Sequence, residues 1–180
     1  IVDKMNNDKN LLTNYIIDGT FCNDRSITDI TYNSGYKLGK QTIYSAYTRL
    51  YQNANKTATL KCLNDIRDKF STTSSRGNAK LTYPIALITA DEVALAGGKY
   101  NTKNENYYLH TNGYFVTMTP CYFPTSDVAS HVSRVNPDGL LDVNWVTTWL
   151  GLRPVINIRS DVLISSGDGT MKSPYQLKLS

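Results

Sequence analysis

The sequence predicts an α+β domain with short antiparallel sheets and two or three helices. Three observations lead to this fold class. From Tyr107 onward, short stretches of alternating apolar and polar residues follow one another, with turn residues between them. A helix start signal lies in the middle of the chain, directly after an apolar run. The length of 180 residues fits one domain, so we assign residues 1–180 to a single ligand-binding unit.

The N-terminal third predicts helical segments. Apolar side chains recur at helical spacing over 1–18, and Gly19 follows as a natural stop, which predicts an N-terminal helix. The chain begins at Ile1 rather than Met, so we expect an export signal or anchor upstream of this helix. Residues 44–51 predict a short amphipathic strand or helical turn.

The middle of the chain predicts a strand followed by a capped helix. The apolar run 81–87 reads as a strand. Thr89 and Glu92 have the spacing of a capping box. In this motif the side chain of each residue accepts a hydrogen bond from the backbone amide of the other. A helix over 90–96 follows, and the glycine pair 97–98 ends it.

The C-terminal half predicts an antiparallel meander. Two strong turn signals divide it, Asn136-Pro-Asp-Gly139 and Ser166-Gly-Asp-Gly169. Between the turn signals the segments are short and alternate in polarity, as half-buried strands do. We expect strands at 114–119, 129–135, 140–145, 152–159, 162–165 and 175–179.

Composition narrows the function classes. The net charge of +4 is mild and scattered, with no run of Lys or Arg dense enough to follow a phosphate backbone, so we expect no nucleic-acid partner. The 13 tyrosines stand among many Asn, Ser and Thr residues, a mixture typical of binding surfaces. Tyr and Thr also suit strands, so composition alone leaves a plain β-rich protein open.

Motifs for catalysis or metal binding are missing from the sequence. The two histidines stand in no metal-binding spacing, and there is no nucleophile elbow and no phosphate-binding glycine loop. Cys121 and His131 share a segment, but no third group to orient them is evident. We interpret Asp24 with Arg25 as a buried structural ion pair. We therefore expect no enzyme activity, no cofactor and no metal.

One proline-containing turn resembles the calcium motif of sugar-binding lectins superficially. Calcium needs several further oxygen ligands beyond Asn136 and Asp138, and the segment offers only Asp142 and Asn144 nearby. We interpret it as a hairpin turn.

The three cysteines lie 40 and 59 residues apart and form no zinc motif. In an exported protein Cys22 could join Cys62 and leave Cys121 free, although the spacing alone does not prove this pairing. No apolar run is long enough to cross a membrane.

The stretch from Tyr114 to Gly151 has an unusual composition for a core meander. Aromatic residues and one cysteine are mixed here with short polar residues, and apolar positions at strand spacing run between them: Phe115, Cys121, Tyr122, Phe123, Trp145 and Trp149. We expect one set of side chains to face inward as a framework and the other to face outward as a contact surface. Trp is highly buried on average, so Trp145 or Trp149 can belong to the core, and which one is exposed stays open.

An ordered series of motifs resembles a known family. The motifs begin with 21–26 and 61–62 and continue through 81–98, 107–109, 117–120, 151–158 and 166–170. They are similar to those of exported, often pilin-like proteins of gut bacteria: the variable proteins of diversity-generating retroelements. The resemblance implies a C-type-lectin-like fold of the formylglycine-generating-enzyme type, in which Gly151-Leu-Arg153 closes a sheet.

The resemblance also implies a role. In such proteins, codons ahead of a fixed C-terminal segment are mutagenised, and the altered residues bind a ligand. The fixed segment here would begin near Gly151, with Glu92, Arg153 and Pro154 in the framework. The enzyme branch of this fold uses two nearby cysteines, and only Cys121 is present, so its oxidase activity does not carry over.

We therefore expect an extracellular, cell-surface-displayed protein that binds an unknown protein or glycan. We expect the protein to contact a membrane only through an anchor upstream of this chain. We expect the chain itself to be monomeric. The alternatives are a structural pilin-like or cell-wall subunit and, third, an oxidase of the formylglycine-generating kind. The expected ligand-binding residues are Phe115, Cys121, Tyr122, Phe123, His131, Ser133, Asn136, Asp142, Asn144, Trp145, Thr147, Thr148 and Trp149.

Overall fold

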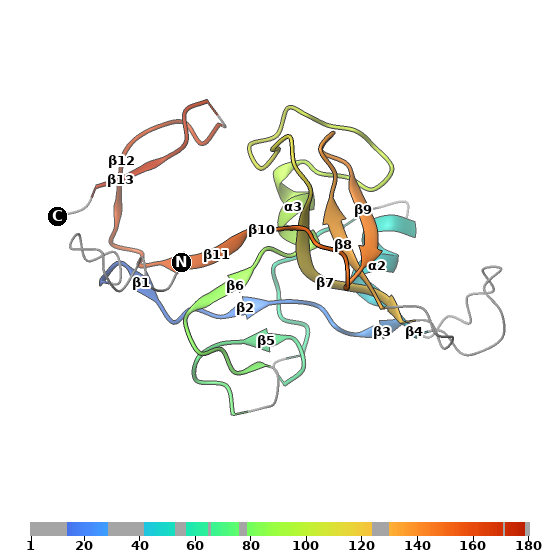
Figure 1. Cartoon of the computed structure of the whole chain (residues 1–180). Coiled ribbons are helices and arrows are strands. Elements are labelled where there is room, and N and C mark those ends of the chain that lie inside the picture. The colour runs from blue at the N-terminus through green and yellow to red at the C-terminus, as the bar shows by residue number, and fades with distance from the viewer. Residues whose placement is uncertain are drawn as a thin grey trace.

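The computed structural model describes residues 14–28, 42–52, 57–64, 66–75, 79–123, 130–170 and 172–178. The described residues form short strands, mostly antiparallel, together with two short α-helices and a π-helical turn, so the α+β class is confirmed (Figure 1). The elements in chain order are β1 (Ile16–Ile17), β2 (Phe21–Cys22), β3 (Ile27–Thr28), β4 (Thr42–Tyr44), α2 (Ser45–Tyr47), η2 (Thr48–Gln52), β5 (Lys69–Phe70), β6 (Ile85–Leu87), α3 (Ala90–Ala96), β7 (Phe115–Phe123), β8 (His131–Val135), β9 (Leu141–Trp145), β10 (Gly151–Leu152), β11 (Pro154–Ile158), β12 (Leu163–Ser166) and β13 (Gln176–Lys178).

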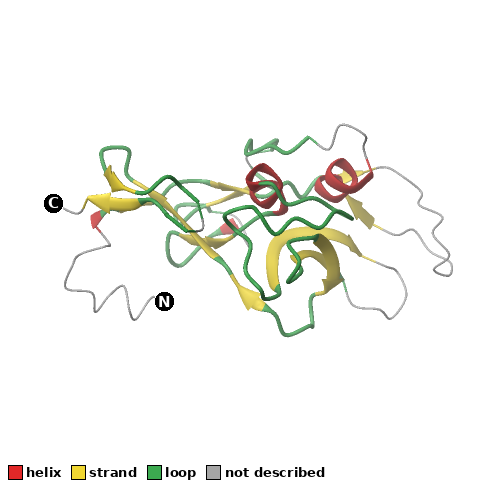
Figure 2. Cartoon of the chain, turned by 90° about the horizontal axis from the view of Figure 1, so that it is seen from above, coloured by secondary structure: helices red, strands yellow, loops and turns green. Residues whose placement is uncertain are grey.

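The largest sheet is built around the long strand β7. Its order is β3-β4-β7-β8-β9, and β10 pairs in parallel with β7 at Phe115. The predicted meander is confirmed for β7, β8 and β9, which follow one another as antiparallel neighbours. Both helices lie on one side of this sheet (Figure 2).

The hairpin turn between β8 and β9 is the one that the sequence predicts. The Gly139 amide donates to the Asn136 carbonyl at 2.9 Å, and the Asn136 amide donates to the Leu140 carbonyl at the same distance. Gly139 has a φ of +75°, in the left-handed region that favours glycine. This turn fixes the register of β8 against β9.

A second sheet, of order β1-β11-β6, pairs the first described strand of the chain with a late strand, and that late strand with a central one. The chain crosses from the first sheet to the second at Arg153, which stands between β10 and β11. Its carbonyl accepts from the Ile88 amide at 3.0 Å, and its guanidinium lies 4.5 Å from the ring centroid of Phe115. The segment from Gly151 therefore ties both sheets together.

The helix α3 begins and ends as its sequence predicts. Thr89 Oγ1 accepts from the Glu92 amide at 3.1 Å, and Glu92 Oε2 accepts from the Thr89 amide at 2.7 Å, which completes the capping box. Such a cap stabilises a helix by about 1 kcal/mol. Gly97 ends the helix with a φ of 118°, and the Gly98 amide donates to the Val93 carbonyl.

Two apolar clusters form the core. The larger one lies between the helices and the inner face of the β7–β9 sheet, and the smaller one joins β2, β5 and β6. Val155 of β11 packs against both clusters, so the second sheet covers the side of the core. The buried members of the larger cluster are Leu50, Ile88, Ala90, Val93, Tyr100, Tyr107, Phe115, Val135 and Leu141.

Buried carboxylates fix the long loops. Asp24 and Asp91 both contact the guanidinium of Arg49, with one oxygen of each 3.2 Å from Nη2. The predicted ion pair between Asp24 and Arg25 is therefore wrong in its partner, although Asp24 is a buried structural acid as expected. The Arg25 guanidinium instead stacks on Phe70, 4.6 Å from the ring centroid.

The cysteine pairing is confirmed. Cys22 and Cys62 form a disulfide, and Cys121 is free and buried. In the residues that the structure describes, no helix has the length and apolar character needed to span a membrane. The disulfide is compatible with a secreted or extracellular protein.

Two predicted elements differ from the structure, and for the segment 44–51 the helical alternative is confirmed. Residues 1–13 of the predicted N-terminal helix lie outside the described residues, and its end is wrong, because Ile16 and Ile17 form β1 and pair with β11. Pairing with a distant strand overrides the helical spacing here. The predicted strand 81–87 is shorter, 85–87, since Pro84 has no amide to donate. Residues 45–52 are helical.

Candidate functional site

Strand alternation divides the predicted contact residues into three groups. Along β8 and β9, odd-numbered residues face the helices and even-numbered residues face the opposite side, as the register from His131↔Trp145 to Val135↔Leu141 shows. A third group lies in the loop between β9 and β10. The predicted surface is therefore not one continuous patch on a single face of the sheet.

Three of the predicted contact residues are wrong, because their side chains are in the core. Cys121 and Ser133 are completely buried, and Phe115 is 4 % exposed. Phe115 packs in the larger cluster beneath Arg153. We expected these residues on the outer surface because they are polar or aromatic. The inward face of β7 and β8, however, carries polar groups of its own.

A buried polar network explains this inward face. The Ser133 hydroxyl contacts the phenol oxygen of Tyr100, and Cys121 Sγ lies 3.1 Å from Ser133 Oγ. Thr117 Oγ1 donates to the Ser133 carbonyl at 2.9 Å, and Thr119 Oγ1 accepts from the Ala90 amide at 2.8 Å. Each of these buried polar groups has a partner, so the network fixes α3 and the loop at Tyr100 against the sheet.

Burial in this network also favours the protonated forms of the Cys121 thiol and the Tyr100 phenol. Burial raises the pKa of the Cys121 thiol to about 12, and hydrogen bonds from Ser133 and Tyr100 offset only part of this effect. Burial likewise raises the pKa of Tyr100 well above 10. A thiol that stays protonated is a poor nucleophile and a poor metal ligand.

A β-bulge brings the aromatic residues to the open end of the same face. The register between β7 and β8 shifts between Pro120 and Tyr122, so that Cys121 and Tyr122 both lie on the inward side. Tyr122 then stacks on His131 with ring centroids 4.1 Å apart, and Trp145 meets His131 edge-on at 6.3 Å. We call Tyr122, His131 and Trp145 the aromatic rim.

The aromatic rim is continuous with the core. Tyr47 of α2 lies 5.8 Å from Tyr122 and 5.7 Å from the buried Tyr100, measured between ring centroids. Exposure rises along this row, from 1 % at Tyr100 to 51 % at Trp145. The rim is therefore held in place by packing on one side and open to solvent on the other. Burial lowers the pKa of His131, whose buried Nδ1 atom has no hydrogen-bond partner within the described part of the chain.

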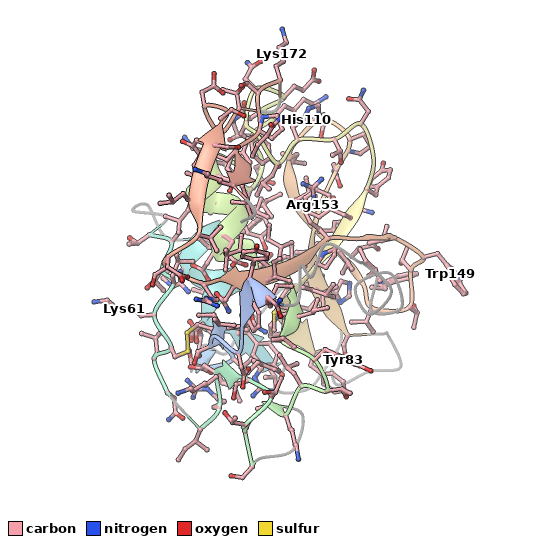
Figure 3. The ribbon with its side chains drawn as sticks, turned by 90° about the vertical axis from the view of Figure 1, so that its left-hand side faces the viewer. Lys61, Tyr83, His110, Trp149, Arg153 and Lys172 are labelled. Carbon is pink, nitrogen blue, oxygen red and sulfur yellow. A yellow bond between two sulfur atoms is a disulfide. The ribbon has the colours of Figure 1, made fainter. Side chains whose placement is uncertain are left out.

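The loop 146–150, which we call the tryptophan loop, carries the most exposed aromatic side chain described. Trp149 is 99 % exposed, and it points away from the body of the molecule in Figure 3. Backbone hydrogen bonds hold both ends of the loop. The Val146 amide donates to the Ser130 carbonyl at 2.9 Å, and the Gly151 amide donates to the Tyr114 carbonyl at 3.1 Å.

Within the tryptophan loop, Asn144 holds the first turn. Its Oδ1 accepts from the Trp145 amide at 2.8 Å and from Thr148 Oγ1 at 3.3 Å, and the Thr148 amide donates to the Trp145 carbonyl. Asn144 is thus a positioning residue for the loop as well as a member of the outer face. Thr147 and Thr148 are exposed, as predicted.

The remaining predicted residues, Asn136 and Asp142, belong to the outer face of β8 and β9. Asp142 Oδ2 accepts from Arg134 Nη2 at 2.9 Å and from Asn136 Nδ2 at 3.3 Å. The Arg134 guanidinium also lies 5.0 Å from the ring centroid of Tyr114. Phe123, at the end of β7, is 51 % exposed.

The prediction from sequence missed Arg134 and included Tyr114 only as a boundary. The signal for Arg134 was available, because counting outward from the turn at 136–139 places it directly across from Asp142. Opposite charges at facing positions indicate a cross-strand ion pair. The planar guanidinium with an adjacent aromatic ring adds a polar, rigid element to the surface.

The described residues contain no group of three or more His, Cys, Asp and Glu side chains placed to hold a metal ion. The Asn136–Gly139 segment is a hairpin turn that packs against another loop, and it holds His110, whose Nε2 lies 2.7 Å from the Pro137 carbonyl. Comparison of the chain with family models, curated proteins and solved structures gives no match.

Proposed function

We propose that this chain is a surface-displayed binding protein that contacts a protein or glycan ligand through the tryptophan loop and the aromatic rim. The observation that carries this proposal is the position of Trp149, fully exposed on a loop whose two ends are hydrogen-bonded to the sheet. A large exposed aromatic side chain on a loop with anchored ends is the type of group that contributes most of the binding energy at interfaces.

The free energy gained by burying an aromatic side chain of this size favours a binding role over chance exposure. Burying a large aromatic side chain of roughly 150–250 Å² stabilises a complex by roughly 4–6 kcal/mol before the costs of association. Trp145 adds a half-exposed ring next to the loop, and Thr147 and Thr148 add hydroxyl groups for hydrogen bonds. This arrangement of aromatic anchors with short polar groups is typical of binding surfaces.

The proposal includes the C-type-lectin-like fold and the diversification that the sequence resemblance implies. Two features support it. β1 near the start of the chain pairs with the late strand β11, and the segment from Gly151 to Arg153 joins the two sheets. The tryptophan loop stands on this framework without contributing to either apolar cluster, so substitutions there leave the core intact.

The proposed role is one of recognition, with no catalysis, cofactor or nucleic acid. The buried, protonated thiol of Cys121 supports this, because an oxidase of the formylglycine-generating kind needs reactive cysteines. The disulfide supports an extracellular, cell-surface-displayed location.

The test begins with an unbiased selection of ligands. The folded chain is probed against a glycan array and against a displayed library of bacterial surface proteins, and hits are confirmed by calorimetry. Trp145→Ala combined with Trp149→Ala is expected to weaken the binding of each confirmed ligand by 100-fold or more, which corresponds to about 2.7 kcal/mol of binding free energy. Tyr175→Ala, which removes a 56 % exposed ring from the distant β12–β13 hairpin, is the matched control and keeps full affinity. Ligands that bind the double variant as tightly as the parent would contradict the proposal.

A further inference from the structure

Four sites in the chain have an asparagine or aspartate directly followed by glycine. At such a site the glycine nitrogen can attack the side-chain carbonyl carbon of the residue before it and close a succinimide ring. Glycine permits this approach because it has no Cβ atom to obstruct it. The four pairs are Asp18-Gly19, Asn112-Gly113, Asp138-Gly139 and Asp168-Gly169, and the structure describes all of them.

Hydrogen bonds hold the carboxylates of two of these pairs. The Thr72 amide donates to Asp18 Oδ1 at 3.0 Å. In the same way, the Thr170 amide donates to Asp168 Oδ1 at 3.0 Å. Hydrogen bonds from these two threonines lower the pKa of both carboxyl groups. A carboxylate that stays ionised is a poor electrophile, so these two pairs resist ring closure.

The third aspartate pair lies in the packed turn between β8 and β9. Asp138 Oδ2 lies 3.2 Å from Lys103 Nζ, so an ion pair holds this carboxylate. The Gly139 amide donates to the Asn136 carbonyl at 2.9 Å, and a Cβ atom on Gly139 would lie 1.7 Å from the Asn104 carbonyl oxygen. Moving the Gly139 nitrogen onto the Asp138 side chain would therefore break a closely packed turn.

The asparagine pair, Asn112-Gly113, lacks all of these restraints. The Asn112 side chain is an uncharged amide, it is exposed, and it forms no hydrogen bond with another residue that the structure describes. No heavy atom lies within 4 Å of a Cβ built on Gly113. The Gly113 amide donates to the Thr111 carbonyl two residues back, which closes a γ-turn on Asn112. An exposed hydrogen bond of this kind contributes little stability, so the segment opens easily.

We propose that Asn112-Gly113 is a site of spontaneous deamidation in this protein. The Gly113 nitrogen gives up its proton and forms a bond to Asn112 Cγ. The bond from Cγ to Nδ2 breaks, and Nδ2 takes up the proton and leaves as ammonia. Water then opens the succinimide, either at Cγ to give aspartate or at the backbone carbonyl carbon to give isoaspartate. The reaction consumes one water molecule and replaces a neutral amide with a carboxylate.

The modified residue lies directly ahead of an anchor of the tryptophan loop. The Tyr114 carbonyl accepts from the Gly151 amide at 3.1 Å, and this bond holds the end of the loop. The Tyr114 ring lies 5.0 Å from the Arg134 guanidinium. An isoaspartate at 112 lengthens the backbone ahead of Tyr114 by one carbon atom, so we expect it to weaken this anchor. The inference goes beyond the proposed function and requires no ligand.

Peptide mapping by mass spectrometry after storage tests the site. The folded chain is kept in warm, mildly alkaline buffer for several weeks and is then digested. We expect Asn112 to convert to aspartate and isoaspartate, whereas Asp18, Asp138 and Asp168 stay free of isoaspartate. Asn106, which is exposed but precedes tyrosine, is the internal control and stays intact. An unmodified Asn112, or equal isoaspartate at the aspartate pairs, would overturn the inference.

A variant at the glycine tests the mechanism. Gly113→Ala adds a methyl group that obstructs attack by the nitrogen and meets no neighbouring atom in the fold. We expect this variant to deamidate at Asn112 severalfold more slowly while its thermal unfolding midpoint stays close to that of the parent. Asn112→Gln should lose the reaction altogether. A folded Gly113→Ala protein that deamidates as fast as the parent would contradict ring closure through the Gly113 nitrogen.

Hydrogen exchange tests the effect on the loop. The isoaspartyl form is separated from the parent by ion-exchange chromatography, since it carries one more negative charge. We expect its Gly151 amide to exchange severalfold faster than in the parent. The Val146 amide, which donates to the Ser130 carbonyl at the other end of the loop, is the control and keeps its rate. Unchanged exchange at Gly151 would show that the modification leaves the anchor intact and would overturn this consequence.

Discussion

The imidazole of His131 lies against the phenol ring of Tyr122, with ring centroids 4.1 Å apart and planes inclined by 22°. The two residues are neighbours across β7 and β8 only because a bulge turns Tyr122 to the inward side. Among the described residues the buried Nδ1 atom has no hydrogen-bond partner, so a protonated imidazole would lose contact with water there and gain no acceptor. Burial therefore favours the neutral form of the histidine in this stack.

This preference for the neutral form predicts an acid-sensitive fold. Burial lowers the pKa of His131 below its usual 6.5, so the unfolded chain binds a proton more readily than the folded chain. The stabilisation is complete above pH 6.5 and is lost as the pH falls through the lowered pKa. The free energy of unfolding from urea titrations should fall over this range in the parent and fall less in His131→Gln. Equal pH slopes in both proteins would contradict the role of His131.

The disulfide and the buried free cysteine predict a different number of reactive thiols in the native, the denatured and the reduced protein. A thiol reagent should find no reactive thiol in the native protein, because Cys121 is buried and its pKa is raised to about 12. After denaturation without reductant we expect one thiol, and after reduction three. Two or more reactive thiols in native material would show that Cys22 and Cys62 are not joined.

We expect position 139 to tolerate no side chain in place of glycine. A Cβ atom there would lie 1.7 Å from the Asn104 carbonyl oxygen, and the residue already has a φ of +75°. Gly139→Ala should lower the free energy of unfolding by about 1–3 kcal/mol or more. Gly113→Ala is the matched control, since no heavy atom lies within 4 Å of its Cβ, and it should change stability little. Equal effects of the two substitutions in thermal unfolding would show that the turn is not packed as described.

Local chemistry made much of the fold predictable. The capping box at Thr89, the glycine stop at Gly97 and the turn at 136–139 each rest on neighbouring residues, and the structure confirms them. Pairings between distant segments were not predictable. Ile16 joins β11 more than a hundred residues later, and the inward side of Cys121 depends on a bulge that no residue type announces.

The candidate site was predictable as a region but not residue by residue. The tryptophan loop and the aromatic rim fall inside the expected stretch, whereas Phe115, Cys121 and Ser133 belong to the core. Ser133 gave the wrong signal, because its hydroxyl is paired inside the fold with Tyr100 and Cys121 instead of facing solvent. Burial of a paired polar network cannot be read from alternation alone.

The two tryptophans provide the most direct test of the central claim, because they are the only ones in the chain and both lie in the proposed contact surface. Acrylamide should quench their fluorescence readily in the free protein. When a ligand recovered by the selection saturates the protein, we expect quenching to fall sharply and the emission to shift to shorter wavelength. A ligand that binds at saturation while acrylamide quenching stays unchanged would contradict the claim that this face recognises it.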